Sequence, residues 1–267
     1  MKKNVKRVQK EKKPIILQSD KLSVRFGGFY AIKEFDFSIP HGELHFLIGP
    51  NGAGKTTFLD AVCGKTKYSE GTLTFNGTTN LAKLKEYEIV REGIGRKFQA
   101  PSIFPFLTVF DNLELAMKQD KRVFPILFSK MKDSDKAKID DMLSLIGLKE
   151  QKNVVAKTLS HGQKQWLEIG MVMMQEPDLL MLDEPIAGMT EEEEEKTGEL
   201  LLELKKRCSI IVVEHDMDFV RKFAEKVTVM HGGQLLCDGT MEEIQRNERV
   251  MEVYLGKKGD QANAKAL

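Results

Sequence analysis

Short apolar runs recur along the chain and predict its main sheet. They are nearly continuous and lie at residues 44–48, 179–182 and 210–213. Apolar runs of this length are typical of strands that are buried on both faces, as in a parallel sheet. A glycine-rich or acidic segment follows each run. The pattern therefore predicts an α/β protein with a mainly parallel sheet.

A second pattern, the alternation of apolar and polar residues, predicts antiparallel strands. It covers residues 22–26 and 35–39, and the glycine pair at 27–28 supplies a turn between them. Residues 72–77 end in Asn-Gly, which is a hairpin signal, and residues 227–237 form a similar pattern around a glycine pair. We therefore expect a small antiparallel sheet beside the parallel one and a hairpin near the end of the chain.

Helical periodicity is concentrated between residues 100 and 176. The apolar residues Ile139, Met142, Leu143 and Ile146 have the spacing i, i+3, i+4 and i+7, which predicts one face of an amphipathic helix. Gly147 is expected to end this helix. Ser160 is a good N-cap for a further helix that runs to about residue 175. The sequence therefore predicts a mostly helical subdomain, at about residues 100–176, inserted into the core.

Capping boxes mark two later helices. Thr190 with Glu193, and Thr240 with Glu243, each place a glutamate three residues after a threonine. The glutamates at 191–195 lie at the positive end of the first of these helices, so we interpret them as a solvated helix start rather than a metal site. We expect the second helix to continue to about residue 255.

One loop carries the clearest chemical signal. It lies between the apolar run at 44–48 and a helical run at 58–62, and it consists of Gly49, Pro50, Asn51, Gly52, Ala53, Gly54, Lys55, Thr56 and Thr57. The pattern G-x-x-x-x-G-K-[ST] in this context is a phosphate-binding loop, whose backbone N–H groups and following helix favour an anion. Lys55 is expected to reach the β- and γ-phosphates, and the Thr56 hydroxyl to bind Mg²⁺. The loop predicts binding of a nucleoside triphosphate.

Composition narrows the class of protein. The formal net charge of the 267 residues is +1, so no overall field favours nucleic acid or an anionic membrane. The chain has no apolar run of 18 residues, and its three isolated cysteines suit free thiols in a reducing compartment. The basic residues 1–13 are interpreted as a disordered tail in preference to a membrane or nucleic-acid arm, and residues 256–267 as a loose tail. These features predict a cytosolic protein.

Polar residues follow two of the predicted parallel strands. Asp183 and Glu184 come after residues 179–182, and Glu214 and His215 come after residues 210–213. The carboxyl ends of parallel strands meet at one edge of a sheet, where α/β proteins place their chemistry. Asp183 and Glu184 are therefore candidates for metal binding and catalysis, whereas His215 on its own is as well explained by a structural role.

In this order and at this spacing, the motifs resemble the ATP-binding subunits of ABC transporters. The likeness extends from Ile15 to Leu255 and predicts one ATP-binding domain at residues 14–255. Leu159-Ser160-His161-Gly162-Gln163 stands where the family has its signature L-S-G-G-Q, and residues 179–184 match the family's Walker B strand with its added glutamate. The resemblance implies a P-loop NTPase core with an antiparallel β subdomain and an inserted α-helical subdomain.

The resemblance also implies a role for each matching residue. Phe26, which alone is better explained as a sheet-core residue, matches the aromatic that stacks on adenine. Thr56, Gln99 and Asp183 would hold Mg²⁺, and Gln99 would also face the attacking water. Glu184 would act as the general base, and His215 would contact the γ-phosphate. A second copy would contribute the remaining groups to each site, namely Ser160, Gly162 and Gln163.

Two departures from the family pattern are informative. His161 replaces the usual second glycine of the signature, and its side chain is expected to point away. Ala187-Gly188-Met189-Thr190 stands where many members have S-A-L-D, so the aspartate that serves communication across the dimer is absent. These positions resemble the branched-chain amino-acid importer group and, within it, the urea (short-chain amide) importer ATPase.

The resemblance implies partners as well. The chain would pair with a second ABC ATPase subunit, identical or related. It would also bind transmembrane permease subunits at the cytoplasmic face of the membrane and so serve an extracytoplasmic solute-binding protein, with no nucleic acid involved. Two alternatives remain open at this point: the ATPase of an exporter or lipid-extraction system, and a soluble ABC ATPase acting on ribosomes or DNA.

Overall fold

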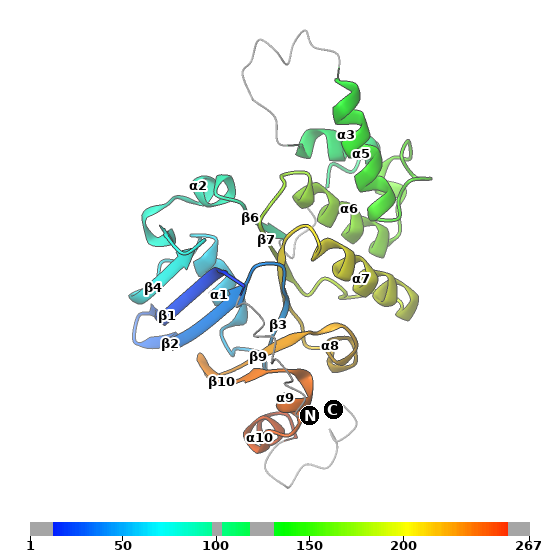
Figure 1. Cartoon of the computed structure of the whole chain (residues 1–267). Helices are drawn as coiled ribbons and strands as arrows, with labels where there is room; N and C mark the ends of the chain where they lie inside the picture. Colours follow the sequence, from blue (N-terminus) through cyan, green and yellow to red (C-terminus); the bar gives the residue numbers. More distant parts are fainter. Residues whose placement is uncertain (1–12, 98–102, 118–130, 256–267) are drawn as a thin grey trace, which may run out of the picture.

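Two sheets form the body of the protein, of which a computed structural model describes residues 13–97, 103–117 and 131–255 (Figure 1). The antiparallel sheet has the order β2-β1-β4-β5 and comprises β1 (Ile15–Phe26), β2 (Phe29–Pro40), β4 (Glu70–Phe75) and β5 (Thr79–Asn80). The larger sheet has the order β10-β9-β3-β8-β7-β6 and comprises β3 (Leu44–Ile48), β6 (Ile94–Lys97), β7 (Leu179–Asp183), β8 (Ser209–Val213), β9 (Lys226–His231) and β10 (Gln234–Gly239). All neighbouring pairs of the larger sheet are parallel except β10 with β9. Both predicted sheets are confirmed.

The central strands bury both of their faces, as their apolar runs predict. Successive side chains of β8 point to opposite faces, so Ile210 and Val212 join one core, and Ile211 and Val213 join the other. The first core lies under the helices, and the second lies between the larger sheet, the antiparallel sheet and α1 (Lys55–Val62). Burial on both sides fixes the register of the strands and therefore the position of the residues that follow them.

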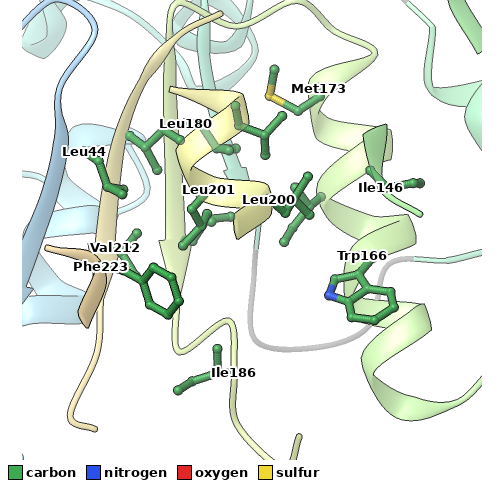
Figure 2. Close-up of a cluster of buried hydrophobic side chains, with 14 of the residues drawn as sticks. Leu44, Ile146, Trp166, Met173, Leu180, Ile186, Leu200, Leu201, Val212 and Phe223 are labelled. Carbon is green, nitrogen blue, oxygen red and sulfur yellow. The ribbon is translucent and has the colours of Figure 1, made fainter. Parts of the chain in front are cut away.

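Helices cover the sheet face of the first core. They are α3 (Val109–Ala116), α5 (Asp133–Leu145), α6 (His161–Met173), α7 (Glu191–Leu204) and α8 (Met217–Phe223). In Figure 1, α3, α5 and α6 lie together at the end of the molecule away from β1 and β2. Figure 2 shows Leu200 and Leu201 of α7 between Val212 of the sheet and Trp166 of α6. Through this packing α7 connects the sheet to α6.

Three shorter elements lie between the strands and helices named so far. They are α2 (Glu86–Arg91) and the 3₁₀ turns η1 (Leu81–Lys83) and η2 (Ala156–Thr158). Cys63, Cys208 and Cys237 are free thiols, as expected. None of the helices built from the described residues is long and apolar enough to cross a bilayer. Gln99, both tails up to residue 12 and from residue 256, and residues 118–130 of the expected insertion lie outside the described residues.

The single helix predicted after Thr240 is wrong: the structure has α9 (Met241–Gln245) and then α10 (Glu248–Leu255). The capping box at Thr240 and Glu243 is present, but α9 ends after one turn. The Asn247 side chain then accepts hydrogen bonds from the N–H groups of Arg249, at 3.0 Å, and Val250, at 3.3 Å. Asparagine in this position caps a new helix, which competes with continuation of the old one.

Candidate active site

The phosphate loop lies at the carboxyl edge of the larger sheet, between β3 and α1. Because β3 is flanked by β8 and β9, the loop stands near the centre of that edge, where α/β proteins bind their ligands. Phe58 of α1 packs edge-on against Phe35 and Phe37 of β2, with ring centroids 5.1 Å apart in both pairs. The antiparallel sheet therefore holds the helix whose N-terminus faces the site.

Two glycines allow the loop to fold tightly onto its neighbours. Gly54 has a φ of 105°, and a Cβ there would lie 2.7 Å from the carbonyl oxygen of Ala31. At Gly49 a Cβ would lie 2.2 Å from the carbonyl oxygen of Met230. No other residue fits these places without moving the backbone, so the spacing that defines the motif follows from close packing against β2 and β9.

Lys55 lies beneath the loop, with 8% of its surface exposed. Its Nζ donates to the carbonyl oxygens of Gly49, at 2.6 Å, and Pro50, at 3.2 Å. Burial lowers the pKa of Lys55, while the carboxylates of Glu184, Asp183 and Glu214 oppose this shift. The ammonium group is thus held inside the loop, close to the carboxylates at the strand tips.

Asp183 ends β7 and is 2% exposed. Burial raises the pKa of its carboxyl group, and the charge of Arg96 is the largest opposing influence. Arg96, on the neighbouring strand β6, donates from Nη2 to Asp183 Oδ2 at 3.4 Å and from Nη1 to Asp60 Oδ1 of α1 at 2.5 Å. Arg96 therefore joins the Walker B strand to the helix after the phosphate loop. This role of Arg96 was not predicted from the sequence, where the available signal was an arginine in a short, buried strand.

The oxygen atoms around Asp183 fit a small hard cation. Asp183 Oδ1 is buried and has no hydrogen-bond partner among the described residues. Thr56 lies close enough to Asp183 for its hydroxyl to favour the ionised carboxylate. A carboxylate oxygen and a hydroxyl are ligands of the kind that Mg²⁺ takes in nucleotide sites. Gln99, the third predicted ligand, lies outside the described residues.

Glu184 and His215 meet at the tips of β7 and β8. Glu184 adopts a φ of 50°, which is uncommon for a residue other than glycine and concentrates at functional sites. Its N–H donates to the carbonyl oxygen of Val213 at 2.9 Å, which fixes the turn. The Glu184 Oε1 lies 3.6 Å from His215 Nδ1, and both side chains are partly open to solvent. The structure thus brings together two residues that are 31 positions apart.

Glu214, beside His215, points into the protein and is 1% exposed. Burial raises the pKa of its carboxyl group to about 7. The carboxyl oxygens accept hydrogen bonds from the N–H groups of Ile186, at 3.3 Å, and His215, at 3.2 Å. Glu214 therefore ties the loop after Glu184 to the loop that carries His215. His215 was predicted from the sequence as a candidate site residue, whereas no sequence pattern indicated that the neighbouring Glu214 is buried.

The signature residues lie at the start of α6 and bind the chain that follows β7. Ser160 Oγ accepts from the Gln163 N–H at 3.2 Å, and the Ser160 N–H donates to Gln163 Oε1 at 3.0 Å, which completes a capping box. Ser160 also donates from Oγ to Glu193 Oε1 at 3.0 Å. His161 donates from Nε2 to the Ala187 carbonyl oxygen at 3.0 Å. These contacts lead to α7 and its preceding loop rather than to the phosphate loop.

Phe26 lies at the end of β1, and 55% of its surface is exposed. It pairs across the hairpin with Phe29, and β2 continues from there to Ala31 beside Gly54. An exposed ring at this place contradicts the sheet-core interpretation of the residue alone and leaves its face available for stacking.

Comparisons with known proteins agree with this geometry. Residues 32–187 match the family model described as ABC transporter, and residues 234–260 match that described as branched-chain amino acid ATP-binding cassette transporter. The high-affinity branched-chain amino acid transport ATP-binding protein LivG of Salmonella typhimurium is 35% identical over 251 residues, which cover 91% of this chain and 98% of that protein. BraF of Pseudomonas aeruginosa, with the same description, is 32% identical over 91% of this chain and 98% of its own length.

Solved structures agree as well. The nucleotide-free ATP-binding cassette of an ABC transporter superposes with a TM-score of 0.77 at 28% identity, covering 91% of this chain and 100% of that one. The ADP conformation of such a cassette gives a TM-score of 0.77 at 28% identity, with 91% and 99% covered. The chain therefore belongs to the ABC transporter family, as an ATP-binding subunit of the branched-chain amino acid importer type.

Proposed function

We propose that the chain binds ATP and Mg²⁺ at the carboxyl edge of the larger sheet and that Glu184 drives hydrolysis there. The observation that supports this most directly is the meeting of Lys55, Asp183, Glu184 and His215 at one edge. Phosphoryl transfer needs positioning and neutralisation of charge more than covalent help. The loop N–H groups and Lys55 supply positive potential, and Phe26 offers a ring face to the adenine.

Each carboxylate has a separate task in this proposal. Asp183 and Thr56, with Gln99, would hold Mg²⁺, which neutralises phosphate charge when it is bound. Glu184 is partly open to solvent and accepts the proton of the attacking water. His215, whose Nδ1 lies 3.6 Å from Glu184 Oε1, would contact the γ-phosphate and orient the base. Glu214 holds the loop after Glu184 to the loop that carries His215, through its hydrogen bonds with Ile186 and His215.

Half of each site comes from a second subunit. Ser160 and Gly162, with Gln163, lie at the N-terminus of α6, and a helix N-terminus with free N–H groups favours a phosphate. Because these residues bind α7 and its preceding loop in their own chain, we infer that they serve the nucleotide of a facing copy or a related subunit. ATP then favours the closed pair, and hydrolysis removes that preference.

The pair works at the cytoplasmic face of the membrane with transmembrane permease subunits. A groove of about 230 Å³ lies between β6 and α6, and apolar residues such as Val90 and Val172 line it. The buried ion pair between Lys97 Nζ and Glu168 Oε2, at 3.4 Å, joins its two walls. β6 ends at Lys97, two residues before Gln99 in the sequence. We infer that an amphipathic cytoplasmic helix of the permease docks here and so senses the nucleotide state.

The solute of this importer is a small polar molecule: urea, another short-chain amide or an amino acid. The names of the relatives favour a branched-chain amino acid. The motifs around His161 and Ala187-Gly188-Met189-Thr190 favour urea or a short amide. The permease and the extracytoplasmic solute-binding protein select the solute, because the ATPase does not contact it.

Purification from membranes tests this function. Expressed with its permease subunits, the chain should remain in the membrane fraction, and solute-loaded binding protein should raise its ATPase activity. Supplying urea and a branched-chain amino acid separately distinguishes the two solute classes. Val172→Asp, which places a charge in the groove, should release the chain and leave nucleotide binding intact. Recovery of the chain with ribosomes or DNA, and not with membranes, would contradict the proposal.

A further inference from the structure

A carboxylate of the same chain lies against the signature residues. Glu193, in the first turn of α7, accepts a hydrogen bond from Ser160 Oγ to its Oε1 at 3.0 Å. A Cβ on Gly162 would lie 2.5 Å from the same oxygen. The carboxylate therefore touches both residues that a second subunit's phosphate is proposed to meet, and Gly162 is needed partly because Glu193 lies so close.

The capping role of Glu193 accounts for only one of its two oxygens. Oε2 accepts from the Thr190 N–H at 3.2 Å, and the Glu193 N–H donates to Thr190 Oγ1 at 3.3 Å, which together form the capping box. Oε1 makes the bond to Ser160 instead. The contact with the signature is thus additional to the capping of α7.

Glu193 carries its charge at neutral pH. The Thr190 N–H lowers the pKa of the carboxyl group, and the hydroxyls of Ser160 and Thr190 and the nearby His161 act in the same direction. The start of α6 therefore already holds one anion. A phosphate that approaches Ser160 meets this charge at close range, and the repulsion is removed only when the carboxylate turns away or is neutralised.

We propose that Glu193 is a positioning residue that covers the phosphate-facing side of the signature and raises the ATP concentration at which two subunits associate. This inference rests on the second-subunit site of the proposed function. In the separate subunit, Glu193 holds Ser160. When ATP arrives on the facing subunit, the phosphate takes over Ser160, and Glu193 keeps its bond to Thr190.

The chain offers a closely matched pair of variants. Glu193→Gln keeps the capping box, because glutamine serves there as well as glutamate, and removes only the charge. Glu191→Gln removes the same charge from the same helix turn, but Glu191 is exposed and contacts neither Ser160 nor Gly162. Both variants alter the helix dipole interaction of α7 alike, so the difference between them isolates the contact with the signature.

The experiment uses the full chain with Glu184→Gln, which slows hydrolysis, and measures association by sedimentation velocity across an ATP titration. Glu193→Gln should lower the half-maximal ATP concentration about fivefold, and Glu191→Gln should leave it within about twofold. Glu193→Ala, which also lacks the cap, should shift it in the same direction. Trp166 is the only tryptophan, and its Nε1 donates to Thr197 of α7, so its emission without nucleotide reports whether the α6–α7 contact is intact.

Two outcomes of the comparison between variants would overturn the inference: equal midpoints for Glu193→Gln and Glu191→Gln, or a higher midpoint for Glu193→Gln than for the parent. The second would mean that Glu193 assists phosphate binding. If the parent chain binds ATP but does not associate at any concentration, a second copy of this chain does not complete the site, and the inference, which concerns two copies, falls with it. Binding of ATP to the single chain, measured separately, distinguishes that failure from loss of the nucleotide site.

Discussion

The phosphate-loop edge of the sheet and the signature end of α6 differ in how they hold their polar groups. At the sheet edge, Lys55 and Asp183 are buried, and strand register and tight glycine turns position them. At the start of α6, Ser160 and His161 are exposed and are held by hydrogen bonds to the Glu193 side chain of α7 and to the Ala187 carbonyl oxygen in the loop before α7. The first region is a preorganised site. The second is an exposed surface, whose contacts a second subunit's phosphate is proposed to replace.

The two regions are nevertheless connected within one chain. The Ala187 N–H donates to the carbonyl oxygen of Glu184 at 3.3 Å, and the Ala187 carbonyl oxygen accepts from His161 at 3.0 Å. A single residue thus links the proposed base of one nucleotide site to the signature that is proposed to serve the other. His161 does not simply point away, as the sequence suggested; it makes this link in a chain that lacks the family's usual aspartate.

The largest expected effect is at the sheet edge. Glu184→Gln keeps the shape of the side chain but cannot accept a proton, so we expect ATP turnover to fall about a thousandfold while ATP binding persists. Steady-state hydrolysis and a nucleotide titration measure the two quantities. Glu191→Gln removes the same charge outside the site and should keep turnover. Near-normal hydrolysis by Glu184→Gln would remove Glu184 from the role of base.

The second largest expected effect is on ATP affinity rather than on the rate of ATP turnover. Lys55→Ala removes the cation inside the phosphate loop, and we expect ATP affinity to fall about a hundredfold, measured by calorimetric titration. Thermal unfolding without nucleotide should accompany the titration, because Lys55 also neutralises buried carboxylates. Unchanged affinity in a folded variant would contradict the assignment of the loop.

The pH dependence of the free energy of unfolding tests whether Glu214 is buried at the sheet edge. The pKa of Glu214 is about 7 in the folded protein, against an ordinary value of 4.5, so the unfolded chain loses this proton first as pH rises. Glu214 therefore makes its full contribution to the free energy of unfolding below about pH 4.5. This contribution is lost as the pH rises to about 7, and it does not return at higher pH.

Glu214→Gln removes this dependence, but its single amide oxygen can replace only one of the two carboxyl oxygens, which accept separately from Ile186 and His215. That loss is the same at every pH, so we expect the stability of the variant relative to the parent to be about 2 kcal/mol more favourable at pH 8 than at pH 4.5, measured by denaturant unfolding without nucleotide. Equal stability differences at the two pH values would show that the pKa of Glu214 is the same in the folded and the unfolded chain.

The smallest effect is at the signature. His161→Gly removes the bond to Ala187, and we expect the ATP concentration for half-maximal association to rise about threefold, since one partly exposed hydrogen bond is lost. His161→Gln keeps a donor and should restore most of the parent value. If His161→Gly keeps the parent value, His161 has no part in connecting the regions.

The sheet edge was predictable because its signals are local. Fixed spacing identified Gly49 to Thr57, and apolar runs placed Asp183 and His215 at strand tips. Arg96 and Glu214 were not predictable, since their importance depends on which strands become neighbours and on how deeply their side chains are buried. Glu193 was correctly interpreted as a helix cap, but its second contact depends on the packing of α7 against α6. Asn247 shows a local signal that was overlooked, because a cap inside an expected helix ends that helix.

The central claim is that one chain holds half of each catalytic site. It is tested most directly by measuring ATPase activity per chain across a range of protein concentrations, with sedimentation of the same samples. Activity per chain should rise with the associated fraction and approach zero where only single chains remain with nucleotide bound. Constant activity per chain down to concentrations at which every subunit is monomeric would contradict the account.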